Sequence, residues 1–419
     1  MSTDEPTPDD AFLERFLSSA FSVAEPDAAG FVESSEDAVR DEDRDEPLPK
    51  SVGRFVVLDV LGEGGSGRVL RAHDPSLGRD VALKIVRASL AADQAACERF
   101  VAEAHVCAGL QHPGIVPIHE FGRLDDGRPY FAMKIVEGQT FAELLRGATR
   151  GAAARGFVEI FEKVCQTLAF VHAHGVLHGD LKPHNVMVGS FGEVQVMDFG
   201  FARHATRDPG IGDVRRPSAP IDAGSGVGDG DGAGSSSRIR IGGTLAYMAP
   251  EQARGDDAAV STRTDVFGLG AMLCEILTGR PPYQARTKAE LLLRASKGWL
   301  DDARERLATC DAERELVDLA LACLAVDPAE RPADAGAVAH AVSSHLRSLA
   351  KRARDAELEA EKARAVAAHE TRARRLTLAL SVAVVAAVIV PALWMVRSAH
   401  ERDERRGAAE HAVGAALER

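Results

Sequence analysis

A short loop at residues 178–185 constrains this chain more than any other feature of its sequence. The loop sets a carboxylate at Asp180, an ammonium at Lys182 and a side-chain amide at Asn185, at offsets of zero, two and five. Phosphoryl transfer from a nucleotide needs that set: a carboxylate orients the attacking hydroxyl, a cation offsets charge on the moving group, and an amide oxygen helps to hold a metal ion. Because eight residues are a small sample, this interpretation depends on partner motifs elsewhere.

A glycine-rich segment at 61–69 is the first such partner. Its three glycines, Gly62, Gly64 and Gly67, lack Cβ atoms, so backbone amides can approach a triphosphate closely. Dinucleotide-binding folds use the same spacing, but they need a strand before it and a helix after it. Here the apolar residues at 55–58 and 69–72 predict the two strands of a hairpin. A further strand is predicted at 81–84, and a helix at about 94–106.

Further motifs follow in order along the chain. They lie at 110–117, 130–138, 194–200, 243–251, 264–270 and 327–332. With the loop and the glycine-rich segment, this series resembles that of protein kinases of the bacterial Hanks type, over about residues 53–345. The resemblance implies an α+β bilobal fold, with a small lobe of antiparallel strands plus one helix and a large, mainly helical lobe. ATP would bind in the cleft between the lobes.

The resemblance also implies a role for each site residue. Glu103, favoured over Glu98 by its sequence context, would hold Lys84, which would anchor the α- and β-phosphates of ATP. Asp180 would orient the acceptor hydroxyl, and Lys182 would stabilise the γ-phosphoryl group. Asn185 and Asp198 would position Mg²⁺. The other residues expected to contact the nucleotide are Gly62, Gly64, Gly67, Val69, Ala82, Met133, Ile135, Val136 and Met187.

Two residues indicate the acceptor class. Lys182, two positions after Asp180, is the serine/threonine pattern of the family. Thr244 matches a threonine that hydrogen-bonds the catalytic aspartate and lysine in relatives, and it suits a serine or threonine acceptor. The chain is therefore expected to be a serine/threonine-protein kinase. A nucleotide-binding pseudokinase scaffold that recruits partners through its tails is the alternative, and a small-molecule phosphotransferase ranks last because it would lack the segments at 243–251 and 264–270.

Gly179 departs from the family pattern, because most members carry arginine there. That arginine binds a phosphate on the activation loop and couples loop phosphorylation to the ordering of the site. Without it, activity should depend weakly on phosphorylation of loop residues such as Thr206, Ser218 or Ser235. The activation segment, 198–251, is long at 54 residues, and its insert at about 205–240 is expected to be flexible and to carry autophosphorylation sites.

The N-terminal segment, 1–50, has a strong acidic bias. It holds fifteen Asp and Glu residues against four Lys and Arg, which supplies −11 of the formal net charge of −13. Such a segment is expected to be disordered and not to bind nucleic acid. Apolar residues at helical spacing between residues 12 and 21 indicate, as an alternative, a short helix that docks on a partner. The six cysteines are scattered without a C-x-x-C pair, as expected of reduced thiols in a cytosolic domain.

The C-terminal part predicts a membrane anchor. Residues 376–396 form a stretch of 21 residues without a charge, long enough to cross a bilayer as a helix in contact with lipid. Residues 346–375 are expected to form a solvated helical linker. Such a linker is compatible with a homodimer that autophosphorylates in trans. Arginines at 372, 374 and 375 precede the stretch, and ATP is cytoplasmic. We therefore expect a single-pass protein of the cell inner (plasma) membrane, with a cytoplasmic kinase domain at 51–345 and a short non-cytoplasmic tail at 397–419.

Overall fold

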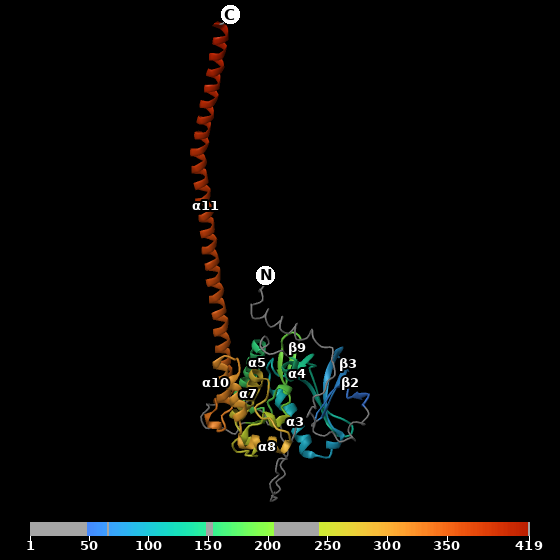
Figure 1. The fold of residues 1–419 in the computed structure, drawn as a ribbon. Helices are drawn as coiled ribbons and strands as arrows, with labels where there is room; N and C mark the ends of the chain where they lie inside the picture. The colour runs from blue at the N-terminus through green and yellow to red at the C-terminus, as the bar shows by residue number, and fades with distance from the viewer. Residues whose placement is uncertain (1–47, 65–66, 148–153, 205–242, 418–419) are drawn as a thin grey trace. The chain divides into compact units, whose positions relative to one another are not determined.

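The computed structural model describes residues 48–64, 67–147, 154–204 and 243–417 (Figure 1). The chain divides into two compact units, Met1–Leu346 and Arg347–Arg419. The acidic segment up to residue 47 and the activation-segment insert at 205–240 lie outside the described residues, as do the expectations made for them.

The first unit begins with a six-stranded antiparallel sheet in the order β1-β2-β3-β4-β6-β5. Its strands are β1 Ser51–Val52, β2 Phe55–Gly64, β3 Gly67–Asp74, β4 Arg79–Val86, β5 Ile118–Arg123 and β6 Pro129–Met133. Gly64 pairs with Gly67 across the β2–β3 hairpin, so the glycine-rich segment lies between two strands. The hairpin predicted from the sequence is confirmed, and a strand-then-helix dinucleotide site is excluded.

Successive side chains of β4 point to opposite faces of the sheet, and the two faces pack against different parts of the unit. Leu83 and Ile85 lie in one buried cluster with residues of β1, β2 and β3. Val86 lies in another cluster, with Phe100 and Ala104 of helix α3, Gln94–Gly109. Lys84 is two residues before Val86 on the strand, so both side chains lie on the α3 side of the sheet. Asp93 caps α3 by accepting a hydrogen bond from the Ala96 N–H at 3.0 Å, which fixes where the helix begins.

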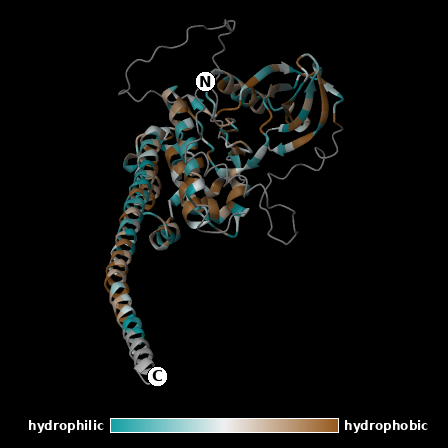
Figure 2. Ribbon diagram, turned by 90° about the horizontal axis from the view of Figure 1, so that it is seen from above, coloured by the Kyte–Doolittle hydropathy of each residue, from teal (hydrophilic) through white to brown (hydrophobic). Residues whose placement is uncertain are grey.

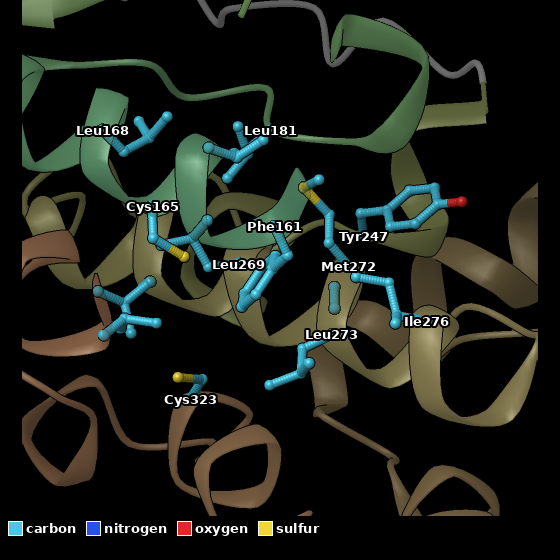
Figure 3. Packing of buried hydrophobic residues seen from close by; sticks show 14 of the residues in the cluster. Phe161, Cys165, Leu168, Leu181, Tyr247, Leu269, Met272, Leu273, Ile276 and Cys323 are labelled. Atoms are coloured by element: carbon cyan, nitrogen blue, oxygen red, sulfur yellow. The ribbon is translucent and has the colours of Figure 1, made fainter. Parts of the chain in front are cut away.

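The rest of the first unit is mainly helical. Its helices are α4 Phe141–Gly147, α5 Ala154–Ala173, α6 Pro250–Ala253, α7 Thr262–Thr278, α8 Lys288–Lys297, α9 Asp301–Thr309 and α10 Arg314–Cys323, followed by the start of α11, Ala335–Leu417. Helix α7 is buried along most of its length and ends at Gly279, whose left-handed backbone (φ 73°) terminates the helix. Figure 3 shows α7 side chains packed against Phe161, Cys165 and Leu168 of α5, with Cys323 of α10 nearby.

Two small sheets and several 3₁₀ turns carry the loops of the site. Strands β7 Gly138–Thr140, β9 Val186–Gly189 and β10 Val194–Val196 form one sheet in the order β10-β9-β7. Strand β8, Val176–Leu177, pairs with β11, Arg203–His204. The 3₁₀ turns are η1 Ala88–Leu90, η2 Pro183–Asn185, η3 Gly243–Ala246 and η4 Pro328–Glu330. This architecture confirms the bilobal α+β fold expected from the sequence.

The second unit consists of the remainder of α11. Its apolar side chains between residues 376 and 396 are exposed, for example Val382 and Trp394, and they appear as a brown band along the helix in Figure 2. A core helix of a soluble domain would bury such residues. By length and composition α11 can cross a membrane. The helix also runs through residues 346–375, where the sequence predicted a helical linker.

Candidate active site

Lys84 and Glu103 form a buried ion pair between the sheet and α3. Lys84 Nζ lies 2.6 Å from Glu103 Oε1 and 3.5 Å from Asp198 Oδ1, so one ammonium contacts two carboxylates. Both Lys84 and Glu103 are buried. Glu98, the competing candidate, is exposed on α3 and accepts a hydrogen bond from Gln94 at 2.8 Å. The structure therefore brings Glu103, and not Glu98, to Lys84.

The charges of Lys84 and Asp198 stabilise each other. Burial acts to lower the pKa of the Lys84 ammonium, but the Glu103 and Asp198 carboxylates outweigh it and raise that pKa above its ordinary value. Burial acts to raise the pKa of the Asp198 carboxyl, but Lys84 and Lys182 outweigh it and the net pKa shift is downward. Both groups are consequently charged at neutral pH, as a site for a phosphorylated ligand and a metal ion requires.

The loop at 178–185 gathers its functional groups around Asp180. One carboxylate oxygen, Oδ2, accepts hydrogen bonds from Lys182 Nζ at 2.8 Å and Asn185 Nδ2 at 3.2 Å. Asn185 Nδ2 also donates to the Asp180 backbone carbonyl at 2.8 Å, which ties the two ends of the loop together. The other oxygen, Asp180 Oδ1, is buried and has no hydrogen-bond partner among the described residues. It can accept a hydrogen bond from a hydroxyl brought to the site.

A buried network that the sequence reasoning did not identify positions this loop. Asp265 of α7 accepts backbone N–H groups of His178 at 2.7 Å and Gly179 at 2.8 Å, and His172 Nε2 lies 2.9 Å from its Oδ2. His172 accepts the N–H of Ala335 at Nδ1 (3.1 Å), which places the ring proton on Nε2 toward Asp265. Burial acts to raise the pKa of Asp265, but the His172 hydrogen bond and nearby histidines lower it. The network holds the loop backbone through an ionised carboxylate.

Asp198 and Asn185 fit the requirements of a hard divalent cation. Asp198 adopts a left-handed backbone conformation (φ 62°), which is uncommon for a residue other than glycine and marks a functional constraint. Since Asn185 Nδ2 is committed to Asp180, its side-chain oxygen is the atom left for a metal. The described residues contain no group of three His, Cys, Asp or Glu side chains suited to a metal. A carboxylate and an amide oxygen suffice where nucleotide phosphates complete the coordination.

The residues expected to contact the nucleotide lie on the β2–β3 hairpin, on β4, β6 and β9, and in the segment that follows β6. Val69 pairs with Lys84, and Ala82 pairs with Met133 in the sheet. Met187 lies on β9, and Ile135 and Val136 follow β6. The glycines differ from one another: a Cβ on Gly67 would lie 2.5 Å from the Ile85 carbonyl, whereas one on Gly62 would meet nothing within 4 Å. Thr244 has its backbone in η3, and its side chain lies outside the described structure.

A second ion pair lies farther from these groups. Arg331 Nη1 and Nη2 donate to Glu251 Oε1 at 2.7 Å and Oε2 at 2.9 Å, and both side chains are fully buried. Thr264 of α7 donates to the same Glu251 Oε1 at 2.9 Å. The pair anchors the end of the activation segment to the helical part of the unit.

Comparison with known proteins gives the same family. The protein kinase domain model matches residues 55–344. Serine/threonine-protein kinase PknD of Protochlamydia amoebophila is 31% identical over 291 residues, which cover 67% of this chain and 28% of that protein. Serine/threonine-protein kinase PknB of Mycolicibacterium smegmatis is 39% identical over 234 residues, or 55% of this chain and 33% of that protein. PknB of Mycobacterium tuberculosis is 38% identical over 234 residues. The chain thus covers about a third of the length of these relatives.

Proposed function

The chain belongs to the protein kinase family, and we propose that it transfers the γ-phosphoryl group of ATP to serine and threonine hydroxyls of proteins. The observation that carries the proposal is the contact of Lys84 with both Glu103 and Asp198, at 2.6 and 3.5 Å. This contact joins a phosphate-binding cation to a metal-binding carboxylate. It is the arrangement that protein kinases need for catalysis.

Each group then has a defined part in the transfer. Lys84, oriented by Glu103, binds the α- and β-phosphates. Asp198 and the Asn185 side-chain oxygen would hold Mg²⁺, which would neutralise charge on the phosphates. Asp180 Oδ1 accepts the hydrogen bond of the acceptor hydroxyl and orients its oxygen toward the γ-phosphorus. Most of the rate acceleration comes from this positioning and from electrostatic stabilisation of the transferring group.

Lys182 supports the choice of serine and threonine acceptors. Its ammonium lies 2.8 Å from Asp180 Oδ2, which places a cation beside the carboxylate whose other oxygen, Oδ1, would receive the hydroxyl hydrogen bond. The relatives named above are called serine/threonine-protein kinases, and this activity is carried over to the present chain as part of the proposal. Proteins with serine or threonine acceptors are the substrates that follow. No observation favours the pseudokinase scaffold, because Lys84, Glu103, Asp180, Asn185 and Asp198 are all in place.

We also propose that α11 anchors the protein in the plasma membrane as a single span at 376–396. The support is the uncharged 21-residue stretch and the exposure of its apolar side chains. Because ATP is cytoplasmic, the kinase domain belongs on that side, and Arg372, Arg374 and Arg375 agree with the excess of positive charge found there. Copies confined to one membrane could phosphorylate each other as a homodimer in trans.

Labelled ATP tests the catalytic proposal. The purified full-length protein, in detergent, is incubated with γ-labelled ATP, Mg²⁺ and a protein acceptor, beside Asp198→Ala and Glu98→Gln. The wild type and Glu98→Gln, which alters an exposed residue of α3, should label the acceptor equally. Asp198→Ala should not, since it removes a metal ligand. Equal labelling by wild type and Asp198→Ala, or no labelling by either, would defeat the proposal.

A further inference from the structure

The side-chain amide of Gln252 connects the loop at 178–185, called the catalytic loop below, to the end of the activation segment. Gln252 lies in α6, directly after Glu251. Its Nε2 donates to the Gly179 backbone carbonyl at 2.7 Å, and its Oε1 accepts the N–H of Ala249 at 3.2 Å. The amide therefore uses both ends at once, one on each of two segments that are 73 residues apart in the chain.

The carbonyl that Gln252 holds belongs to the peptide bond directly before Asp180. The N–H of that same peptide donates to His178 Nδ1 at 3.2 Å, and the N–H of Gly179 donates to Asp265 Oδ1 at 2.8 Å. The orientation of this peptide plane sets the backbone angle φ of Asp180 and therefore influences the direction of its side chain. Gln252 supplies the hydrogen bond on the carbonyl side of the plane.

Glycine makes such a restraint necessary. Gly179 has a left-handed backbone (φ 78°), and a Cβ there would lie 2.9 Å from the Phe201 carbonyl. A glycine accepts this conformation without strain, but it has little preference for it and more freedom to leave it than any other residue. Contacts from neighbouring segments must therefore fix its orientation.

We propose that Gln252 is a positioning residue that aligns Asp180 with the segment at 243–251, which resembles the substrate-binding segment of protein kinases. The inference rests on the kinase activity proposed above. The arginine of the family pattern, which would bind a loop phosphate and so couple the activation segment to the loop at 178–185, is replaced here by Gly179. Here a neutral amide makes that connection, and it needs no phosphate.

A contact between the start of the activation segment and the residues just after its end is weaker. Arg203 and Asp257 form an ion pair at 2.7 Å, but their side chains are 48% and 65% exposed. Exposed pairs of this kind contribute little, because water and salt screen them. The partly buried Gln252 amide is therefore the connection that matters for the catalytic loop.

Two variants of the full-length protein test the inference. Gln252→Glu keeps an oxygen for the Ala249 N–H but removes the donor to Gly179, and Gln252→Ala removes both bonds. Gln94→Ala is the matched control, since the Gln94 amide donates to exposed Glu98 on α3. The readouts are kcat for an acceptor protein, the Kd of ATP with Mg²⁺, and the melting temperature.

Both Gln252 variants should lower kcat by about 10- to 100-fold, the cost of a misplaced catalytic group. The Kd of ATP should not change, because Lys84, Glu103 and the glycine-rich segment are untouched, and Gln94→Ala should match the wild type. Wild-type kcat in Gln252→Glu would overturn the inference. A parallel fall of kcat, ATP affinity and melting temperature would also overturn it, because it would indicate a general structural role. If the wild type itself shows no labelling that depends on Asp198, the kinase proposal fails instead.

Discussion

Removing Arg331 from the buried pair with Glu251 should destabilise the kinase domain more than almost any other single substitution. Both side chains are fully buried, so Arg331→Met leaves the Glu251 carboxylate in the interior without its two charged hydrogen bonds. Stranding one partner of a buried ion pair costs about 3–5 kcal/mol. That is a large part of the 5–15 kcal/mol that stabilises a typical domain (about 0.05–0.15 kcal/mol per residue).

The structure adds to this cost. Three backbone carbonyls also accept hydrogen bonds from the same guanidinium, those of Arg263, Ala325 and Val326. Methionine cannot donate to them. At about 2–4 °C per kcal/mol for a large domain, the melting temperature should fall by at least about 6 °C. Thermal unfolding of the full-length protein, followed by circular dichroism, measures the shift.

Two further variants show whether the reasoning is right. Arg314→Met removes an exposed ion pair with Asp318 (3.0 Å; side chains 84% and 55% exposed) and should change stability by no more than about 0.5 kcal/mol. Glu251→Gln combined with Arg331→Met should be less destabilising than the sum of the two single changes, because no buried charge is stranded. A shift for Arg331→Met no larger than that for Arg314→Met would refute the account.

Three other predictions concern regulation, thiol chemistry and location. Replacing Thr206, Ser218 and Ser235 together with alanine should leave most kinase activity intact, because Gly179 offers no cation to a loop phosphate; a large loss of labelling would contradict this. Burial raises the pKa of the Cys274 thiol to about 11, so this thiol is protonated at about pH 8 and should resist iodoacetamide in the native protein. Half-buried Cys97 should react before it. Equal modification of the two cysteines, measured by mass spectrometry, would be inconsistent with this. Deleting the apolar segment of α11 should move the protein from the membrane fraction to the soluble fraction, and an unchanged distribution would count against a membrane span.

The local parts of the site could be predicted because local sequence determines them. The glycine-rich hairpin follows from two short apolar runs around closely spaced glycines. The approach of Glu103 to Lys84 follows from a family motif on a predicted helix, and helical spacing alone could not separate it from Glu98. Asp180, Lys182 and Asn185 come together because they share one tight loop. The structure agrees with each of these expectations in geometry, and their catalytic roles remain proposals.

The contacts between distant segments could not be predicted in the same way. Asp265 lies in the motif at 264–270, and it holds the backbone of His178 and Gly179 from 87 and 86 residues away, respectively. Gln252 gave no signal, because its partner is a backbone carbonyl and any residue has one. Such contacts depend on how α6 and α7 pack under the loop, and no periodicity in the sequence reports that packing.

Steric detail also separates residues that the sequence treats alike. Gly62 and Gly67 belong to one motif, but only Gly67 lies so close to a neighbouring strand that a Cβ would clash with the Ile85 carbonyl. The requirement comes from the β3–β4 register, in which Gly67 pairs with Val86. A sequence pattern records that glycine is present and does not record why.

The most direct test of the central claim measures what Asp180 does. In a single turnover with labelled ATP and a protein acceptor, the wild type should produce phosphoserine and phosphothreonine. Asp180→Asn, which keeps the shape of the side chain but removes its charge, should bind ATP with Mg²⁺ as the wild type does and transfer the phosphoryl group at least about 100-fold more slowly. Equal transfer rates in the two proteins, or phosphotyrosine as the product, would contradict the account.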